Sequence, residues 1–179
     1  MLGIGTMIWL ASELMFFSGL FAAYFAIRAH NMPNWPPPGV HLDVLLSGLA
    51  TIVLVASSGT FQMAVIALEK GNKSKARTWI VISFIMGCIF LTNQGYEWTH
   101  LPFSVSSNAF GSMFYLMTGF HGLHVTLGLI AMLGLLLRIS GPGKDPGEVA
   151  VIQAVSYYWH FVDVVWVGLY TVLFLLTLK

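Results

Sequence analysis

Charged residues are scarce in this sequence. Only 8% of its 179 residues are Asp, Glu, Lys or Arg, whereas a soluble domain usually contains about 25%. Hydrophobic residues make up 57%, and the mean hydropathy is +0.80. This composition excludes an ordinary soluble domain and predicts a chain that lies in a lipid bilayer. The net charge is +1 and there is no basic run beyond one short loop, so nucleic acid is not expected as a partner.

Cysteine is almost absent, since Cys88 is the only one. A single cysteine excludes an internal disulfide and a metal site built on paired thiolates. Cys88 stands in an apolar stretch, and we interpret it as a packing residue. No signal peptide is expected either, because no basic leader or small-residue cleavage site precedes the first apolar run.

Long apolar runs are what the sequence does contain. A bilayer core of about 30 Å requires roughly 20 helical residues, and five runs are long enough. Each run must be helical, because lipid offers backbone amides no partners. We therefore predict an all-α fold, a single transmembrane domain over residues 1–179 in which five helices form a bundle. The predicted spans cover approximately residues 2–27, 44–68, 78–98, 110–137 and 149–178.

The loops between the spans predict the direction of the chain. Four of the eight basic residues lie in the second loop, residues 69–77, and Arg138 and Lys144 belong to the fourth loop, residues 138–148. These loops share one side of a five-span bundle, and short loops rich in Lys and Arg remain in the cytoplasm. The N-terminus is therefore predicted to be cytoplasmic and the C-terminus outside.

Three of the seven acidic residues, Glu13, Glu97 and Asp163, interrupt the apolar spans. With a helical rise of 1.5 Å per residue, Glu13 and Asp163 both lie about 15–20 Å from the cytoplasmic side, near mid-depth. Glu97 lies close to the outer boundary, where water can hydrate it.

Histidines reach the same depth from other positions. His121 and His124 lie about 15–20 Å from the outer side, and His160 shares a helix face with Asp163. An ionisable group at mid-bilayer costs at least ~2.5–3.5 kcal/mol, so these side chains should face protein or water. We expect one buried polar layer made of Glu13, His121, His124, His160 and Asp163.

Two further patterns predict helix contacts. Trp159, Asp163 and Trp166 lie on one side of the last span. Gly19 and Gly122 each begin a pair of small residues at four-residue spacing, which lets helices approach closely, although glycine is also simply common in membrane helices.

Four interpretations of the polar layer compete. Haem or metal ligation is disfavoured, because no span carries two His about two turns apart and a lone intramembrane His more often forms hydrogen bonds. An independent proton or ion transporter that uses Glu13 and Asp163 as relay groups is disfavoured by the absence of inverted repeats and broken helices. A purely structural layer, and an accessory subunit whose layer supports a neighbouring catalytic subunit, cannot be separated from the residues alone.

Several motifs together resemble subunit III of the haem–copper terminal oxidases. They follow the family's order from Trp9 to about Tyr170. Their sequences resemble those of cytochrome c oxidases of the actinobacterial type more than those of quinol oxidases. The motifs are "WLASELMFFSGLF" (9–21), "WPPPGVH" (35–41), "QGYEWTHLPFSVSSNAFGSMFYL" (94–116), "TGFHGLHV" (118–125) and "YYWHFVDVVW" (157–166).

The resemblance implies a non-redox accessory subunit of a cytochrome c oxidase in the bacterial plasma membrane. Subunit III of this family carries no haem or copper, and it packs against subunit I, which reduces dioxygen and pumps protons. Haem and copper are thus expected in partner subunits I and II. The family is thought to hold phospholipid and to keep proton uptake fast, and a respiratory supercomplex is a further candidate assembly. The alternatives are subunit III of a quinol oxidase and, from another class, an independent proton-coupled transporter.

The resemblance also assigns the polar residues, with no catalytic residue and no metal ligand among them. Lipid-binding residues are not carried over. Mitochondrial-type members have seven spans and hold lipid between the first two and the other five, and this chain matches only those five. The matched residues are Glu13, Glu97, the pair His121 and His124, and the pair His160 and Asp163.

Overall fold

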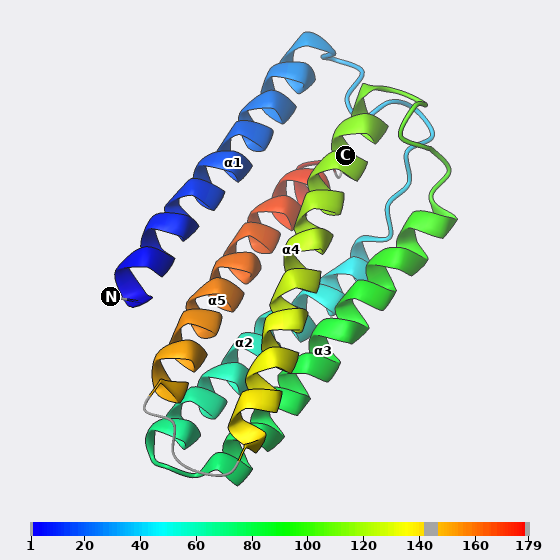
Figure 1. Cartoon of the computed structure of the whole chain (residues 1–179). Coiled ribbons are helices and arrows are strands. Elements are labelled where there is room, and N and C mark those ends of the chain that lie inside the picture. The colour runs from blue at the N-terminus through cyan, green and yellow to red at the C-terminus, as the bar shows by residue number, and fades with distance from the viewer. Residues whose placement is uncertain (1, 142–146, 178–179) are drawn as a thin grey trace.

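The computed structural model describes residues 2–141 and 147–177, and it is all-helical over these ranges (Figure 1). Within these ranges, five helices have the length and hydropathy needed to cross a bilayer. The predicted all-α membrane fold with five spans is therefore confirmed, whereas a single domain over residues 1–179 stays a prediction. The elements are α1 (Leu2–His30), α2 (Val44–Glu69), α3 (Lys73–His100), α4 (Ala109–Ser140), α5 (Glu148–Leu173) and a short 3-10 turn, η1 (Leu175–Thr177).

Three helices begin at a polar residue that caps the first turn. The side chains of Asp43, Asn72 and Asn108 each accept a hydrogen bond from the backbone N–H three residues further on, at the starts of α2, α3 and α4. Such a cap is worth about 1 kcal/mol. The cap at Asn72 explains why α3 begins at Lys73 rather than at residue 78. The first turn of α3 is helical but basic. A hydropathy pattern detects the apolar part of a helix and misses polar turns that extend beyond it.

The turn between α2 and α3 depends on Gly71. Its φ of +76° lies in the left-handed region that glycine adopts without strain. This conformation lets the N–H groups of Gly71 and Asn72 donate to the carbonyl oxygens of Leu68 and Ala67, which closes the end of α2. As a result, α2 and α3 form an antiparallel hairpin joined by residues 70–72.

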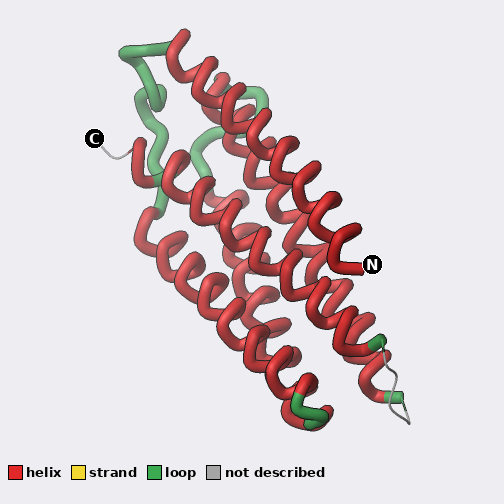
Figure 2. The backbone as a smooth tube through the Cα atoms, turned by 90° about the vertical axis from the view of Figure 1, so that its left-hand side faces the viewer, coloured by secondary structure: helices red, strands yellow, loops and turns green. Residues whose placement is uncertain are grey.

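The helices run side by side, and their connections gather at the two ends of the bundle (Figure 2). α5 packs against both α2 and α4, and α1 lies at the edge against α5 and α4. Within the described part of α1, the buried side chains are Phe17 and Tyr24. The rest of α1 presents mostly apolar side chains outward, as expected for a helix that faces lipid.

The described ends of the two loops predicted to share one side of the bundle lie at the same end, whereas Lys144 lies outside the described residues. Lys73 at the start of α3 forms a 2.8 Å ion pair with Glu148 at the start of α5. Arg77 donates a 2.6 Å hydrogen bond to the carbonyl oxygen of Ile139 near the end of α4. We call this the basic end of the bundle. Which side of the membrane it faces stays a prediction.

The centre of the bundle is built around Trp159 of α5. This side chain is fully buried and lies against Gly87 of α3 and Gly128 of α4, where a Cβ atom would come within 3.0 Å and 2.7 Å of the indole. Among the glycines predicted to mediate helix contacts, Gly122 does approach α3. The prediction for Gly19 is wrong, because the space around it is open in the described chain.

Candidate functional site

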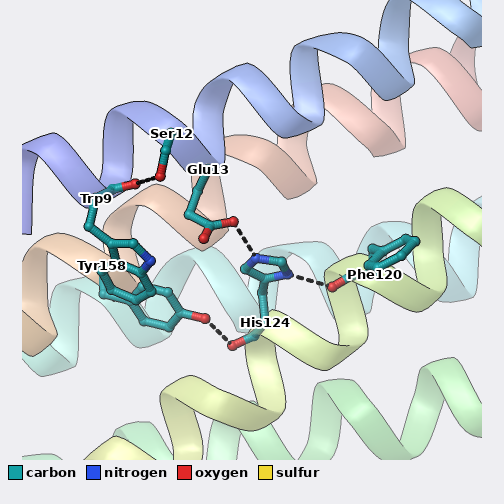
Figure 3. A network of polar contacts seen from close by, with 6 residues as sticks. All are labelled: Trp9, Ser12, Glu13, Phe120, His124 and Tyr158. Carbon is teal, nitrogen blue, oxygen red and sulfur yellow. Dashed lines mark hydrogen bonds and ion pairs between the residues drawn. The ribbon is translucent and has the colours of Figure 1, made fainter.

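Glu13 of α1 and His124 of α4 meet inside the bundle (Figure 3). A carboxyl oxygen of Glu13 lies 3.0 Å from Nε2 of His124, and Nδ1 of His124 lies 2.7 Å from the carbonyl oxygen of Phe120. A carbonyl oxygen only accepts hydrogen bonds, so Nδ1 carries a proton. A second proton lies between Nε2 and Glu13 and can belong to either group. In both arrangements the pair has no net charge, which suits an apolar environment.

Aromatic side chains surround this pair. The Tyr158 hydroxyl of α5 donates a 2.8 Å hydrogen bond to the carbonyl oxygen of His124, and Trp9 of α1 stacks on the Tyr158 ring at a centroid distance of 5.1 Å. The ring of Phe17 contacts His124 edge-on. The side chains of Glu13 and His124 are only 23% and 10% exposed. We name Glu13, His124 and Tyr158 the Glu13 cluster, which joins α1, α4 and α5.

A second set of polar contacts, the α2–α5 seam, joins α2 to α5. Trp159, Asp163 and Trp166 were predicted to share one face of α5. This face lies against a row of hydroxyl groups on α2. The hydrogen bonds run from Ser58 to Asp163, from Trp159 to Ser57 at 2.9 Å, and from Trp166 to Thr51 at 2.8 Å.

Asp163 is 6% exposed and lies at the middle of this seam. Ser58 donates to one carboxyl oxygen, Oδ2. The other oxygen, Oδ1, is buried and has no hydrogen-bond partner within residues 2–141 and 147–177. The contacts available in this chain therefore satisfy only half of the carboxyl group.

His121 and His160 lie apart from the Glu13 cluster. His121 is fully buried with its ring centroid 4.8 Å from that of Trp166, and neither ring nitrogen has a hydrogen-bond partner in the described part of the chain. His160 is partly exposed, and its Nε2 makes a long 3.4 Å contact with Gln62. The structure thus divides the expected single layer into separate groups. Helical rise fixes the height of a residue, but not the neighbouring helix that its side chain faces.

Glu97 is 8% exposed, although it lies near the C-terminal end of α3. Its Oε1 accepts a 2.9 Å hydrogen bond from Ser47 at the start of α2. The expected hydration of this carboxyl group is therefore a wrong prediction, because the first turn of α2 covers it.

The sequence reasoning missed the hydroxyl partners on α2. Serine and threonine in membrane helices commonly bond to carbonyl oxygens of their own helix, and Thr51 also does so here. One signal was available. Thr51 and Ser58 are two turns apart, so they form a polar stripe on one face of an otherwise apolar helix.

Within the described residues, no group of three or more His, Cys, Asp or Glu side chains is arranged to hold a metal ion. The two histidines on α4 face different surroundings, His124 toward Glu13 and His121 toward Trp166.

Comparison with known proteins identifies the family. The family model for cytochrome c oxidase subunit III matches residues 1–177. The chain belongs to this family. It is 50% identical over 177 residues to the probable cytochrome c oxidase subunit 3 of Mycobacterium tuberculosis (strain ATCC 25618 / H37Rv), covering 97% of this chain and 87% of that protein. It is 51% identical, with the same coverage, to that of Nocardia farcinica. The cytochrome c oxidase subunit 3 of Synechocystis is 41% identical over 174 residues, covering 96% of this chain and 74% of that protein.

Membership in the subunit III family confirms the resemblance found in the motifs. The relatives at about 50% identity include actinobacterial proteins, as the motif wording indicated. The chain is a multi-pass membrane protein and an accessory subunit III of an oxidase, which makes it part of a multi-subunit oxidoreductase complex.

Proposed function

We propose that this subunit III is a non-redox scaffold of a bacterial cytochrome c oxidase, packed against subunit I in the plasma membrane. Oxygen reduction and proton pumping, with the haem and copper that they require, belong to subunits I and II. The observation that carries the proposal is the match to the subunit III family along residues 1–177. The geometry supports it, because Glu13, His124 and Asp163 are engaged in contacts between helices.

The Glu13 cluster holds α1 to the rest of the bundle. In lipid, burial of apolar side chains gives little net attraction between helices, because acyl chains are equally apolar. A hydrogen bond between helices is worth about 1 kcal/mol there. The Glu13–His124 bond therefore contributes a directional attraction to α1, which has few buried side chains, in addition to the 3.3 Å hydrogen bond from the Tyr24 hydroxyl to the Val172 carbonyl oxygen of α5. It also sets the height of α1 against α4.

The basic end of the bundle faces the cytoplasm in this proposal. Short connections that carry several Lys and Arg residues remain on the cytoplasmic side during insertion. The N-terminus is then cytoplasmic and the C-terminus outside. The basic residues at this end are Lys70, Lys73, Lys75, Arg77 and Arg138.

Bound phospholipid is also part of the proposed function. A groove of about 470 Å³ lies between α2 and α3 at the basic end, with apolar walls that include Met63, Ile66 and Trp79. Lys70 and Lys75 also line this groove, and neither side chain forms an ion pair with the described residues. An anionic headgroup can bind the two ammonium groups while an acyl chain lies along the walls.

Native mass spectrometry of the purified oxidase tests the lipid site. Lys70→Gln combined with Lys75→Gln should reduce retained anionic phospholipid severalfold. The matched control is Lys73→Gln combined with Arg138→Gln, which removes the same charge at the same end but outside the groove. Equal lipid loss in both double variants would show that only the overall charge matters.

Co-purification in mild detergent tests the scaffold role. A tagged chain should isolate together with haem-containing subunit I and with subunit II, and the chain separated from them should be colourless. A subunit II with a dinuclear copper motif supports cytochrome c as electron donor, whereas its absence supports the quinol alternative. Isolation without haem proteins, together with proton-coupled uptake by this chain alone in liposomes, would overturn the proposal in favour of a transporter.

A further inference from the structure

α1 is held to the bundle unevenly along its length. Towards its C-terminal end, the Tyr24 hydroxyl donates a 3.3 Å hydrogen bond to the Val172 carbonyl oxygen of α5. The indole of Trp35, in the loop that follows, donates a 3.1 Å bond to the same hydroxyl. The Phe21 ring also lies against the backbone of α5. These contacts fix residues 20–30, which we call the anchored segment.

The first part of α1 is less well packed. From residue 3 to residue 12, the described helix has no buried side chain. A groove of about 180 Å³ lies between this stretch and the helices α4 and α5, and its lining side chains include Thr6, Trp9 and Tyr158. Trp9 reaches across the interface and stacks on Tyr158 (Figure 3). This part of α1 therefore lies over a gap rather than on a packed surface.

Glu13 and Phe17 lie between the gap and the anchored segment. The 3.0 Å contact of Glu13 with His124 is directional. Phe17 is 1% exposed, and its ring lies against the rings of His124 and Phe161. In a bilayer this apolar contact adds little attraction, because acyl chains would surround a displaced Phe17 equally well. The Glu13–His124 bond is therefore the principal restraint on residues 2–17, which we call the arm.

A flexible point joins the arm to the anchored segment. Ser18 and Gly19 are adjacent, and sharp bends in helices commonly occur at such pairs of Gly and Ser. The Ser18 hydroxyl donates a 2.7 Å hydrogen bond to the Leu14 carbonyl oxygen of its own helix, a contact that often bends helices. The space around Gly19 is open in the described chain, so no neighbouring side chain blocks a change in direction there.

We infer that α1 is a hinged helix whose arm swings away from α4 and α5 about Ser18 and Gly19. The hydrogen bond between Glu13 and His124 holds the arm closed. With a rise of 1.5 Å per residue the arm is about 24 Å long, so a bend of about 15° moves its tip by roughly 6 Å. The open arm connects the groove beneath it to the bilayer and lets acyl chains reach His124. This device goes beyond the scaffold role, for which a fixed α1 is sufficient, and it requires no partner subunit.

Distances between spin labels on introduced cysteines test the hinge in the full chain in lipid nanodiscs. Cys88→Ser removes the native thiol. The arm pair of labels, at Ile8 on α1 and Leu133 on α4, reports on the arm. The control pair, at Phe25 on α1 and Leu116 on α4, reports on the anchored segment. All four positions are 43–68% exposed, so the labels do not disturb the core.

Glu13→Leu removes the bond that holds the arm. It should lengthen the mean distance of the arm pair by roughly 4 Å, as expected for the same bend, and broaden its distribution. The control pair should not change. A wild-type distance of the arm pair in Glu13→Leu would overturn the inference. Equal changes in both pairs would overturn it too, because they would show a rigid helix that tilts as a whole. The other oxidase subunits are absent from this experiment, so neither result bears on the proposed function.

Gly19→Ala tests the position of the hinge. Alanine has the higher helix propensity and fits the open space at residue 19, so it should reduce the broadening caused by Glu13→Leu at least twofold. Gly5→Ala is the matched control, because Gly5 also has open space around it but lies within the arm, and it should leave the broadening unchanged. Circular dichroism checks that each variant forms its helices. Equal effects of the two alanine variants would overturn the assignment of the hinge to Ser18 and Gly19.

Discussion

The indole ring of Trp159 lies directly on the backbone of Gly128. A Cβ atom at residue 128 would come within 2.7 Å of two ring carbons, and the Tyr158 ring would be 3.3 Å away. Gly134, further along the same helix, has open space on its surface. Gly128 is therefore needed for the close contact between α4 and α5, whereas Gly134 takes no part in this contact.

Substitution of these glycines should give opposite results. Gly128→Ala should lower the free energy of unfolding by about 1–3 kcal/mol, because the indole cannot move without disturbing the packed centre. Gly134→Ala should be neutral or slightly stabilising, since alanine has the higher helix propensity and meets no neighbour. Thermal unfolding in detergent, followed by circular dichroism, measures both. Equal stability of the two variants would contradict the packing described for Trp159.

The pair formed by Glu13 and His124 predicts a difference between two substitutions of the acid. Glu13→Leu should lower the free energy of unfolding by about 1 kcal/mol, because Nε2 of His124 loses its partner. Glu13→Gln should cost less than half as much, since an amide can still form the hydrogen bond. Equilibrium unfolding in a denaturing detergent compares them, with the exposed Met15→Leu change on α1 as control. A glutamine variant as unstable as the leucine variant would argue against the hydrogen bond.

The indole N–H of Trp166 makes Thr51 a structural residue. Thr51→Val keeps the shape of the side chain but removes the acceptor, so a buried donor is left without a partner. The expected loss is about 1 kcal/mol. Thr126→Val is the control, because Thr126 is exposed and, among the described residues, bonds to the Gly122 carbonyl oxygen of its own helix. Tryptophan fluorescence during unfolding follows both variants, and the prediction fails if they unfold at the same detergent concentration.

The positive φ of Gly71 predicts a local effect at the basic end. Gly71→Ala should cost about 1–2 kcal/mol, because a Cβ atom is strained in the left-handed region. Gly59→Ala, in the middle of α2 where the space is open, should not destabilise the chain. Amide hydrogen exchange should show faster exchange near residues 68–76 in Gly71→Ala alone. Unchanged protection of this turn would contradict its dependence on glycine.

Much of the fold was predictable from the sequence, because membrane physics leaves few alternatives. A run of about 20 apolar residues in lipid must be helical, and all five spans were found. The bounds were less accurate where polar residues continue a helix beyond the membrane. Lys73 belongs to α3 because Asn72 caps it, and a hydropathy pattern does not detect that hydrogen bond.

The candidate site was predicted only in part. Residue identity predicted polar groups that meet inside the bundle, and Glu13 does lie 3.0 Å from His124, whereas their depth in the membrane stays a prediction. The same reasoning could not show that Asp163 faces α2, since the rotation of a helix about its axis depends on packing with all its neighbours. Glu97 illustrates the opposite error. Its position near a helix end suggested contact with water, but the start of α2 lies over it.

The α2–α5 seam restricts how these two helices can be aligned. Its three hydrogen bonds lie at different heights along α2. Sliding α5 along α2 by one helical turn, 5.4 Å, would break all three together. Apolar side chains alone would allow many relative positions of two helices along their axes in a bilayer, whereas these hydrogen bonds allow one. The side chains on this surface of the bundle therefore keep fixed heights relative to one another, whatever molecule packs against them.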